Sequence, residues 1–336
     1  FVSKVLRSGA AYQILKVIDT KSETVRVVKV ISRSMIYDDK ISSDIEYLLK
    51  RKQKEYSTSR LLADFQTTFD WFMVFAQPRI TLRDVLESKK LMPLPARHVR
   101  EITSQIISAA HSLHRRSMLH LDICPSMVEL ASFSTNVEYE YTSNSTFQLR
   151  LSLSCASGEP IQETDFTRRC TKIYLVFHGD AAIAGDRNIG TDQYRAPEVV
   201  LGWASKFRTD NFSIGCVMWE LIKGHALFPP CEEERNYIKA KIHAFKAVLG
   251  YFPRQMRERA ALTHEGLFKK STGELQEPWD LSDGLKHFID GAEEIEVAIR
   301  DIDIYHVVHA LTRLSPRDRL PLCDVLTMPY FSERTY

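Results

Sequence analysis

The segment LHRRSMLHLDICPSMVEL, residues 113–130, decides the fold together with two later segments. It completes a pattern of apolar residues at helical spacing and continues into a loop that carries His120 and Asp122. IYLVFHGDAA (173–182) then has the pattern of a buried strand followed by a turn, and GTDQYRAPEVVLG (190–202) comes next. The order of these three segments is the most specific signal in the sequence.

Length and composition limit the class of protein. A chain of 336 residues is too long for one compact core, so we expect two lobes. With 44% hydrophobic and 26% charged residues the composition is that of an ordinary globular protein. The net charge of +2 gives no electrostatic argument for nucleic acid or an anionic membrane, and no apolar run is long enough to cross a bilayer. The six cysteines lack paired spacing, which favours reduced thiols and an intracellular location.

The N-terminal part has the patterns of strands. YQILKVID (12–19) and TVRVVKVIS (24–32) are rich in β-branched residues and predict a hairpin, and FDWFMVFAQP (69–78) predicts a further strand that Pro78 ends. DDKISSDIEYLLKRKQ (38–53) has apolar residues at helical spacing. Helical patterns dominate from Leu82 onward.

These patterns predict an α+β fold with a small β-rich lobe over residues 1–76 and a larger helical lobe over residues 77–336. The hinge is expected at about 75–80. Residues 131–170 are rich in Ser, Thr and Asn and contain the alternating stretches VEYEYT and FQLRLSLS, which predict an inserted hairpin.

The three segments resemble those of protein kinases. LHRRSMLHLDICPSMVEL resembles the kinase catalytic loop, and GTDQYRAPEVVLG resembles the end of the activation segment. Within the kinases the chain resembles the CDC-like (LAMMER) family, because KVISRSMIYDDKISSDIEYL and IHAFKAVLGYFP align with its segments, although the second does not spell the LAMMER signature. The resemblance covers essentially the whole chain and implies the bilobal kinase fold.

The resemblance places unusual residues at the catalytic positions. Phe177 stands where kinases have the metal-binding Asp, Met127 where they have the metal-binding Asn, and Cys124 where a Lys neutralises the transferred phosphoryl group. A thioether and a phenyl ring do not bind Mg²⁺, which prefers oxygen ligands. In a slipped register Asp180 would be the ligand, but the residues after it do not match, so we expect a solvated loop carboxylate there.

The nucleotide pocket implied by the resemblance is altered as well. Arg7 and Tyr12 replace the outer glycines of the phosphate loop, and Pro78, which has no N–H, stands where a backbone donor meets the adenine. Glu129 would put a carboxylate against the base, which costs several kcal/mol. From these positions we predict weak or absent binding of ATP and Mg, no cofactor and no metal site.

Other residues that kinases use are retained. Asp122 stands at the catalytic-base position, and Lys29 and Asp44 stand at the positions of the strand–helix ion pair. We interpret all three as vestigial. Glu198 with Arg319, and Asp210 with the loop around His120, correspond to pairs that stabilise the kinase fold.

The first functional hypothesis is therefore a pseudokinase, not an enzyme, that acts as a protein-binding scaffold or allosteric regulator. One alternative is a divergent protein Ser/Thr kinase or other nucleotide-dependent transferase that uses Asp122. Another is a sensor of a small ligand other than ATP. A thermal-shift titration with ATP and divalent metals distinguishes the first from the other two.

Protein partners are expected at one of two long segments, 131–170 or 251–300, which the core of the two lobes does not need. Neither nucleic acid nor a membrane is expected as a partner. The resemblance to CDC-like kinases slightly favours a nuclear over a cytoplasmic location.

Overall fold

The computed structural model divides the chain into two compact units. The sheet unit comprises Phe1–Pro95 and Pro125–Gly185, and the helical unit comprises Ala96–Cys124 and Asp186–Tyr336. Each is described by itself. The residues that the structure describes are 1–8, 12–33, 61–75, 79–88, 92–141, 147–155, 173–176, 190–204, 206–269, 271–276 and 281–332.

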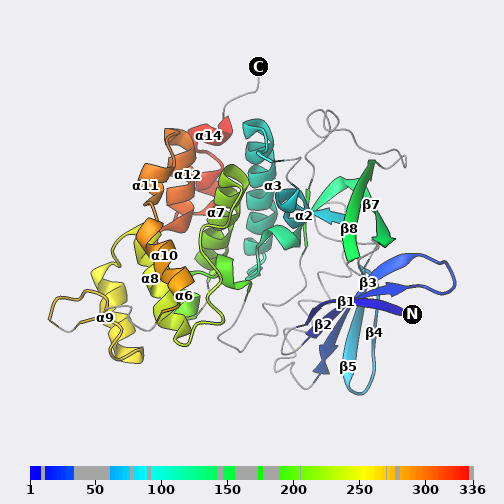
Figure 1. Cartoon of the computed structure of the whole chain (residues 1–336), viewed down its shortest axis with the longest axis horizontal. Coiled ribbons are helices and arrows are strands. Elements are labelled where there is room, and N and C mark those ends of the chain that lie inside the picture. The colour runs from blue at the N-terminus through cyan, green and yellow to red at the C-terminus, as the bar shows by residue number, and fades with distance from the viewer. Residues whose placement is uncertain are drawn as a thin grey trace. The chain divides into compact units, whose positions relative to one another are not determined.

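A five-stranded antiparallel sheet forms the first part of the sheet unit (Figure 1). The predicted hairpin over residues 12–32 is confirmed, since its two strands pair from Tyr12 with Ile31 to Ile18 with Val25. The strand order is β1-β2-β3-β5-β4. Their bounds are β1 Val2–Ser8, β2 Tyr12–Ile18, β3 Val25–Ser32, β4 Leu61–Gln66 and β5 Asp70–Phe75.

One face of this sheet is buried. Along β5 the buried residues alternate with half-buried ones, because successive side chains of a strand point to opposite faces. Met73 and Phe75 are buried, and their cross-strand partners are Lys29 and Val27 of β3. The register therefore places Lys29 on the buried face.

A second sheet completes the sheet unit. Its strands are β6 Arg79–Thr81, β7 Val128–Tyr141, β8 Phe147–Cys155 and β9 Ile173–Leu175, and β7 pairs with all the others. β7 and β8 form the hairpin predicted within residues 131–170. The helix α2, Leu82–Glu87, begins at Thr81, whose side chain and that of Asp84 form a capping box.

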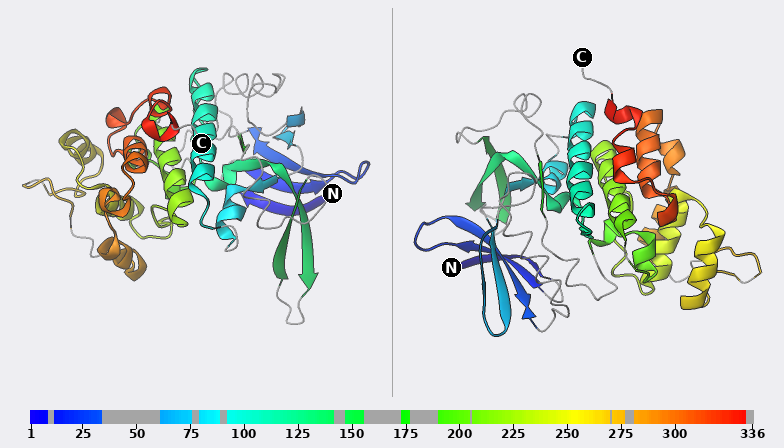
Figure 2. Two further views of the ribbon diagram at one scale, coloured as in Figure 1. Left: turned by 90° about the horizontal axis from the view of Figure 1, so that it is seen from above. Right: turned by 180° about the vertical axis from the view of Figure 1, so that it is seen from behind.

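The helical unit is built around α7, Phe207–Lys223. Residues Thr209–Leu221 of this helix are all buried, as the apolar sequence predicts for a central helix. α7 packs between α3, Ala96–His114, and α12, Ile302–Thr312 (Figures 1 and 2). The other helices are α6 Pro197–Val200, α8 Tyr237–Leu249, α9 Arg254–Thr263, α10 Asp283–Gly291, α11 Ile295–Ala298, α13 Leu322–Val325 and α14 Pro329–Ser332.

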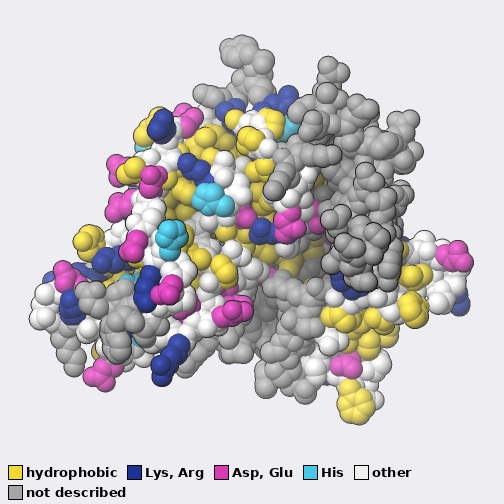
Figure 3. Space-filling view, in the orientation of Figure 1, with side chains coloured by type: hydrophobic (Ala, Val, Ile, Leu, Met, Phe, Trp, Pro, Cys, Tyr) yellow, Lys and Arg dark blue, Asp and Glu magenta, His cyan; other side chains and the backbone are white. Residues whose placement is uncertain are grey.

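The predicted α+β class is confirmed: the described strands lie in the sheet unit, and the described α-helices other than α2 lie in the helical unit. The predicted helix over 38–53 and hinge residues 76–78 lie outside the described residues, so the lobe boundary at 76/77 stays a prediction. Within the described part of the chain, no helix combines the length and apolarity needed to span a membrane. On the face shown in Figure 3, acidic and basic side chains of the helical unit are interspersed.

Candidate active site

The carboxylate of Asp122 is held in a fixed position inside the helical unit. Asp122 is 4% exposed, and its Oδ1 atom accepts hydrogen bonds from the backbone N of Thr191 at 2.6 Å and from the Thr191 hydroxyl at 2.7 Å. The same hydroxyl lies 3.5 Å from the Sγ atom of Cys124. Hydrogen bonds to a carboxylate are stronger than those between neutral groups. The two bonds therefore link the loop that carries Asp122 firmly to the segment that carries Thr191.

Asp210 of α7 holds the loop from the other side. Its two carboxylate oxygens accept the backbone N–H groups of His120 at 2.9 Å and Leu121 at 2.7 Å. Oδ2 also lies 2.8 Å from Nε2 of His114, a contact that sequence reasoning missed because the two residues are far apart in the chain. Leu121 has a φ of 61°, a conformation that costs a non-glycine residue energy. The Asp210 contacts stabilise this strained loop.

Glu198 and Arg319 form a bidentate ion pair. The two Nη atoms of Arg319 donate to the two oxygens of Glu198, each at 2.7 Å. Arg319 also donates to the carbonyl oxygens of Arg313, Arg208 and Leu314, so each of its N–H donors has an acceptor. Both side chains are buried, and the pair joins the start of α6 to the segment before α13.

In the sheet unit, Lys29 and Met127 are the described residues at positions that kinases use. Lys29 of β3 has no solvent exposure, and Met127 is 4% exposed. Met127 ends a 3-10 turn, Pro125–Met127, and its carbonyl oxygen accepts the N–H of Val176 at 2.7 Å. Glu129 is half-buried in β7 opposite Tyr174.

The remaining predicted site residues lie outside the part of the chain whose side chains the structure describes. Asp44, Pro78 and Phe177 lie outside the described residues. Arg7 and Tyr12 lie in β1 and β2, and the structure describes only the backbone of these two residues. Among the residues described, no group of His, Cys, Asp and Glu has the arrangement of a metal site.

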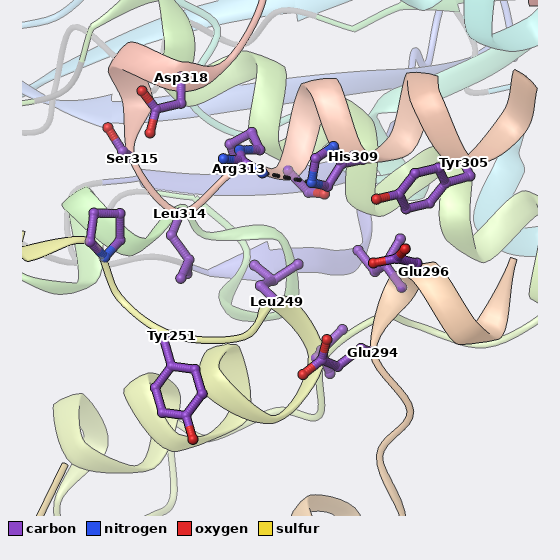
Figure 4. A pocket seen from close by; sticks show the side chains of 14 residues that line it. Leu249, Tyr251, Glu294, Glu296, Tyr305, His309, Arg313, Leu314, Ser315 and Asp318 are labelled. Atoms are coloured by element: carbon purple, nitrogen blue, oxygen red, sulfur yellow. Dashed lines mark hydrogen bonds between the residues drawn. The ribbon is translucent and has the colours of Figure 1, made fainter. Parts of the chain in front are cut away.

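A separate cavity of about 210 Å³ lies in the helical unit (Figure 4). Tyr305 and His309 of α12 stack in it with ring centroids 5.1 Å apart, and Nη1 of Arg313 donates to Nε2 of His309 at 2.7 Å. Burial and the nearby Arg313 lower the pKa of His309, so the imidazole is neutral at pH 7. Glu294 and Glu296 line the cavity as well.

The comparisons with known proteins identify the fold. The family profile described as the protein kinase domain matches residues 179–331. A crystal structure of a kinase domain superimposes with a TM-score of 0.72 at 17% identity, covering 98% of this chain and 94% of that one. The predicted bilobal protein-kinase fold is therefore confirmed.

Several relatives are kinases of the CDC-like type. Probable serine/threonine-protein kinase clkA of Dictyostelium discoideum is 22% identical over 97% of this chain and 35% of its own length. Serine/threonine-protein kinase AFC2 of Arabidopsis thaliana is 24% identical over 97% of this chain and 75% of its own. Dual specificity protein kinase CLK2 of Homo sapiens is 22% identical over 98% and 63%. The chain thus resembles CDC-like kinases, as predicted, and spans about a third of the Dictyostelium protein.

These relatives contradict two predictions. The chain was predicted not to be an enzyme, whereas the relatives are named as serine/threonine and dual-specificity protein kinases. The predicted absence of a cofactor is contradicted for the same reason, since protein kinases use ATP with Mg²⁺. Both predictions depended on substituted positions such as Met127 and Phe177, and gave too little weight to the retained Lys29 and Asp122.

Proposed function

We propose that the chain is a divergent protein kinase domain that transfers the γ-phosphoryl group of ATP to a Ser or Thr hydroxyl of a protein. The single observation that carries the proposal is the fixed carboxylate of Asp122, buried in a kinase fold and anchored by Thr191. A base in such a site must be held within hydrogen-bond reach of the proton it accepts.

Asp122 supplies the acid–base step. Its carboxylate orients the acceptor hydroxyl and takes the hydroxyl proton as the oxygen bonds to phosphorus and the bond to the leaving ADP oxygen breaks. The backbone N–H and the hydroxyl of Thr191 each donate a hydrogen bond to Oδ1 of Asp122. Both donors belong to one residue and bind the same carboxylate oxygen.

Lys29 fits a role in holding the ATP phosphates. Its side chain is fully buried on the inner face of the five-stranded sheet, at the position where kinases place the lysine that holds the phosphates. Met127 does not fit a role as ligand of Mg²⁺, because its thioether is a soft donor. No step of the proposed reaction is assigned to the metal.

The test is transfer of labelled phosphate from ATP to a mixed Ser/Thr protein substrate by the purified chain. Asp122→Asn keeps the shape of the side chain and removes its basicity, so we expect transfer to fall by at least about a hundredfold. Asp324→Asn serves as a matched control on an exposed carboxylate and should leave the rate unchanged. Equal rates for wild type and Asp122→Asn overturn the proposal.

We also propose that a protein partner binds at 251–300, one of the two segments predicted from the sequence. The cavity in Figure 4 supports this choice, because Tyr251, Glu294 and Glu296 line it and Tyr251 is 81% exposed. Large exposed apolar or aromatic side chains beside a cavity are typical of interaction sites. The hairpin within 131–170 is the competing site.

Partner binding is tested by affinity capture with three forms of the chain. Tyr251→Ala combined with Glu294→Ala should lose a protein that wild type retains, whereas a form with residues 131–170 deleted should keep it. Glu233→Ala, at an exposed carboxylate outside 251–300, is the control substitution. If only the form that lacks residues 131–170 loses the protein, the partner binds at the hairpin and not at 251–300.

A nuclear location is a further proposal, supported by the resemblance to CDC-like kinases. Fluorescence microscopy of the tagged full-length protein tests it, and a purely cytoplasmic signal would contradict it.

A further inference from the structure

A lysine is buried in the helical unit close to the Asp122 segment. Lys241 of α8 has no solvent exposure, and its Nζ lies 3.4 Å from Oδ1 of Asp192 and 5.8 Å from the ring centroid of Phe245. Burial lowers the pKa of Lys241, and the negative charge of Asp192 opposes that shift. Burying an ammonium group is costly unless it is paired, so its partner Asp192 indicates what the lysine does.

The two carboxylate oxygens of Asp192 have different partners: Oδ2 accepts a backbone N–H, and Oδ1 faces two cations. Its Oδ2 accepts the backbone N–H of Cys231 at 2.7 Å. Its Oδ1 lies 3.4 Å from Nζ of Lys241 and 3.5 Å from Nη1 of Arg195. The charge of Asp192 is therefore divided between Lys241 and Arg195.

Arg195 and Asp122 hold opposite sides of one peptide group. Nη2 of Arg195 donates to the carbonyl oxygen of Gly190 at 2.6 Å, and the N–H of the same peptide, that of Thr191, donates to Asp122 at 2.6 Å. Gly190 has a φ of 78°, and a Cβ atom there would lie 2.4 Å from the carbonyl oxygen of Leu121. Only glycine fits this close approach, so the orientation of the peptide depends on its two hydrogen-bond anchors.

We propose that Lys241 is a positioning residue for Asp122. Lys241 neutralises part of the negative charge of Asp192. Nη2 of Arg195 therefore keeps its hydrogen bond to the Gly190 carbonyl oxygen, and the Thr191 N–H keeps its hydrogen bond to Asp122. Nη1 of Arg195 also donates to the uncharged hydroxyl of Tyr237. Without the lysine, Arg195 is the cation that remains against Oδ1 of Asp192 among the described residues, and Asp192 draws the guanidinium away from Gly190. The proposal rests on the role of Asp122 as the base in the proposed function.

The thiol of Cys124 reports on this arrangement without any need for activity. Cys124 is 2% exposed and its Sγ contacts the Thr191 hydroxyl, so alkylation requires the Thr191 segment to open. The experiment measures the alkylation rate of Cys124 in the folded chain without nucleotide, by peptide mass spectrometry, with exposed Cys323 as the internal reference. Lys241→Met should raise the Cys124 rate roughly tenfold, as expected when a hydrogen bond to a charged group is lost. Lys246→Met, on the same helix, should leave it unchanged.

A double variant separates positioning from packing. In Lys241→Met/Asp192→Asn the neutral amide no longer draws Arg195, so the Cys124 rate should return to within about twofold of wild type. If Lys241 only packs, the double variant reacts at least as fast as Lys241→Met, and that result overturns the proposal. An unchanged rate in Lys241→Met overturns it as well.

Arg195→Lys keeps the test decisive if Lys241→Met does not fold. A single ammonium group cannot bridge Asp192 and Gly190 as the guanidinium does, so the Cys124 rate should again rise roughly tenfold. A wild-type rate in Arg195→Lys contradicts the proposed relay.

Kinetics then connect the relay to the reaction. Lys241→Met should lower kcat roughly tenfold with little change in KM for ATP, and the double variant should recover most of the loss. If wild type shows no transfer that depends on Asp122, the proposed function fails, while the Cys124 rates still decide the positioning role. A changed KM with unchanged kcat would overturn the link to Asp122.

Discussion

Two segments that follow each other in the sequence are stabilised in different ways. The loop His120–Cys124 is held through side chains: the Asp210 carboxylate accepts two of its backbone N–H groups, and the carboxylate of its own Asp122 accepts the N–H and the hydroxyl of Thr191. The next segment, from the Pro125–Met127 turn into β7, is held by backbone pairing with β9, Val128 opposite Leu175. A segment held by its backbone should tolerate changes of side chain better, and Met127 lies in such a segment. Contacts made by side chains restrict substitution in the first segment.

The largest expected effect comes from removing one partner of a buried ion pair, which is a contact made by side chains alone. Glu198→Ala leaves Arg319 buried and unpaired, and should lower the free energy of unfolding by about 3–5 kcal/mol. Urea denaturation measures the loss. Glu258→Ala removes the partner of Arg254, and both of these side chains are exposed, at 60% and 83%. Exposed ion pairs contribute little to stability, so that control should lose much less than Glu198→Ala, and equal losses in the two variants would contradict the comparison.

An intermediate effect is expected at Asp210. Asp210→Asn keeps the shape but weakens the acceptors for the N–H groups of His120 and Leu121, at a cost of about 1.5–3 kcal/mol. Hydrogen exchange should accelerate at these two amides by roughly tenfold to a hundredfold. The amides of β9 serve as the internal control, and their acceleration by the same factor would show global unfolding instead of local release of the loop.

The smallest effect is expected in the backbone-held segment. Met127→Leu conserves volume and should change the free energy of unfolding by less than about 1.5 kcal/mol. Met127→Asn adds an oxygen ligand that Mg²⁺ prefers, so MgATP should raise the melting temperature of this variant by about 2 °C more than that of Met127→Leu. A loss above about 3 kcal/mol in Met127→Leu would show that the side chain is essential to this segment.

Much of the fold could be predicted from the sequence, because the signals are local. The β-branched runs at 12–19 and 24–32 predicted their hairpin. The alternating stretches within 131–170 predicted β7 and β8. The strand order and the edge positions of β1 and β4 depend on contacts between distant segments, which periodicity does not reveal.

The site was only partly accessible to sequence reasoning. The contacts of Glu198 with Arg319 and of Asp210 with the His120 loop correspond to motif positions. Thr191 and Lys241 were missed as functional residues, because their partners Asp122 and Asp192 lie far away in the chain. The conclusion that the chain is not an enzyme was wrong because it gave the substituted positions more weight than the retained Asp122, which it interpreted as vestigial.

The pair between Glu198 and Arg319 has a consequence for how the protein is made. The two residues are separated by 121 positions, so the ribosome presents Glu198 long before the arginine that neutralises it. Until then the carboxylate has no partner of that strength and favours water, which keeps the start of α6 from docking on its neighbours. Nascent chains that stop before Arg319 should therefore be captured by chaperones, and the segment that carries Thr191 should be among the last to become protease-resistant during synthesis.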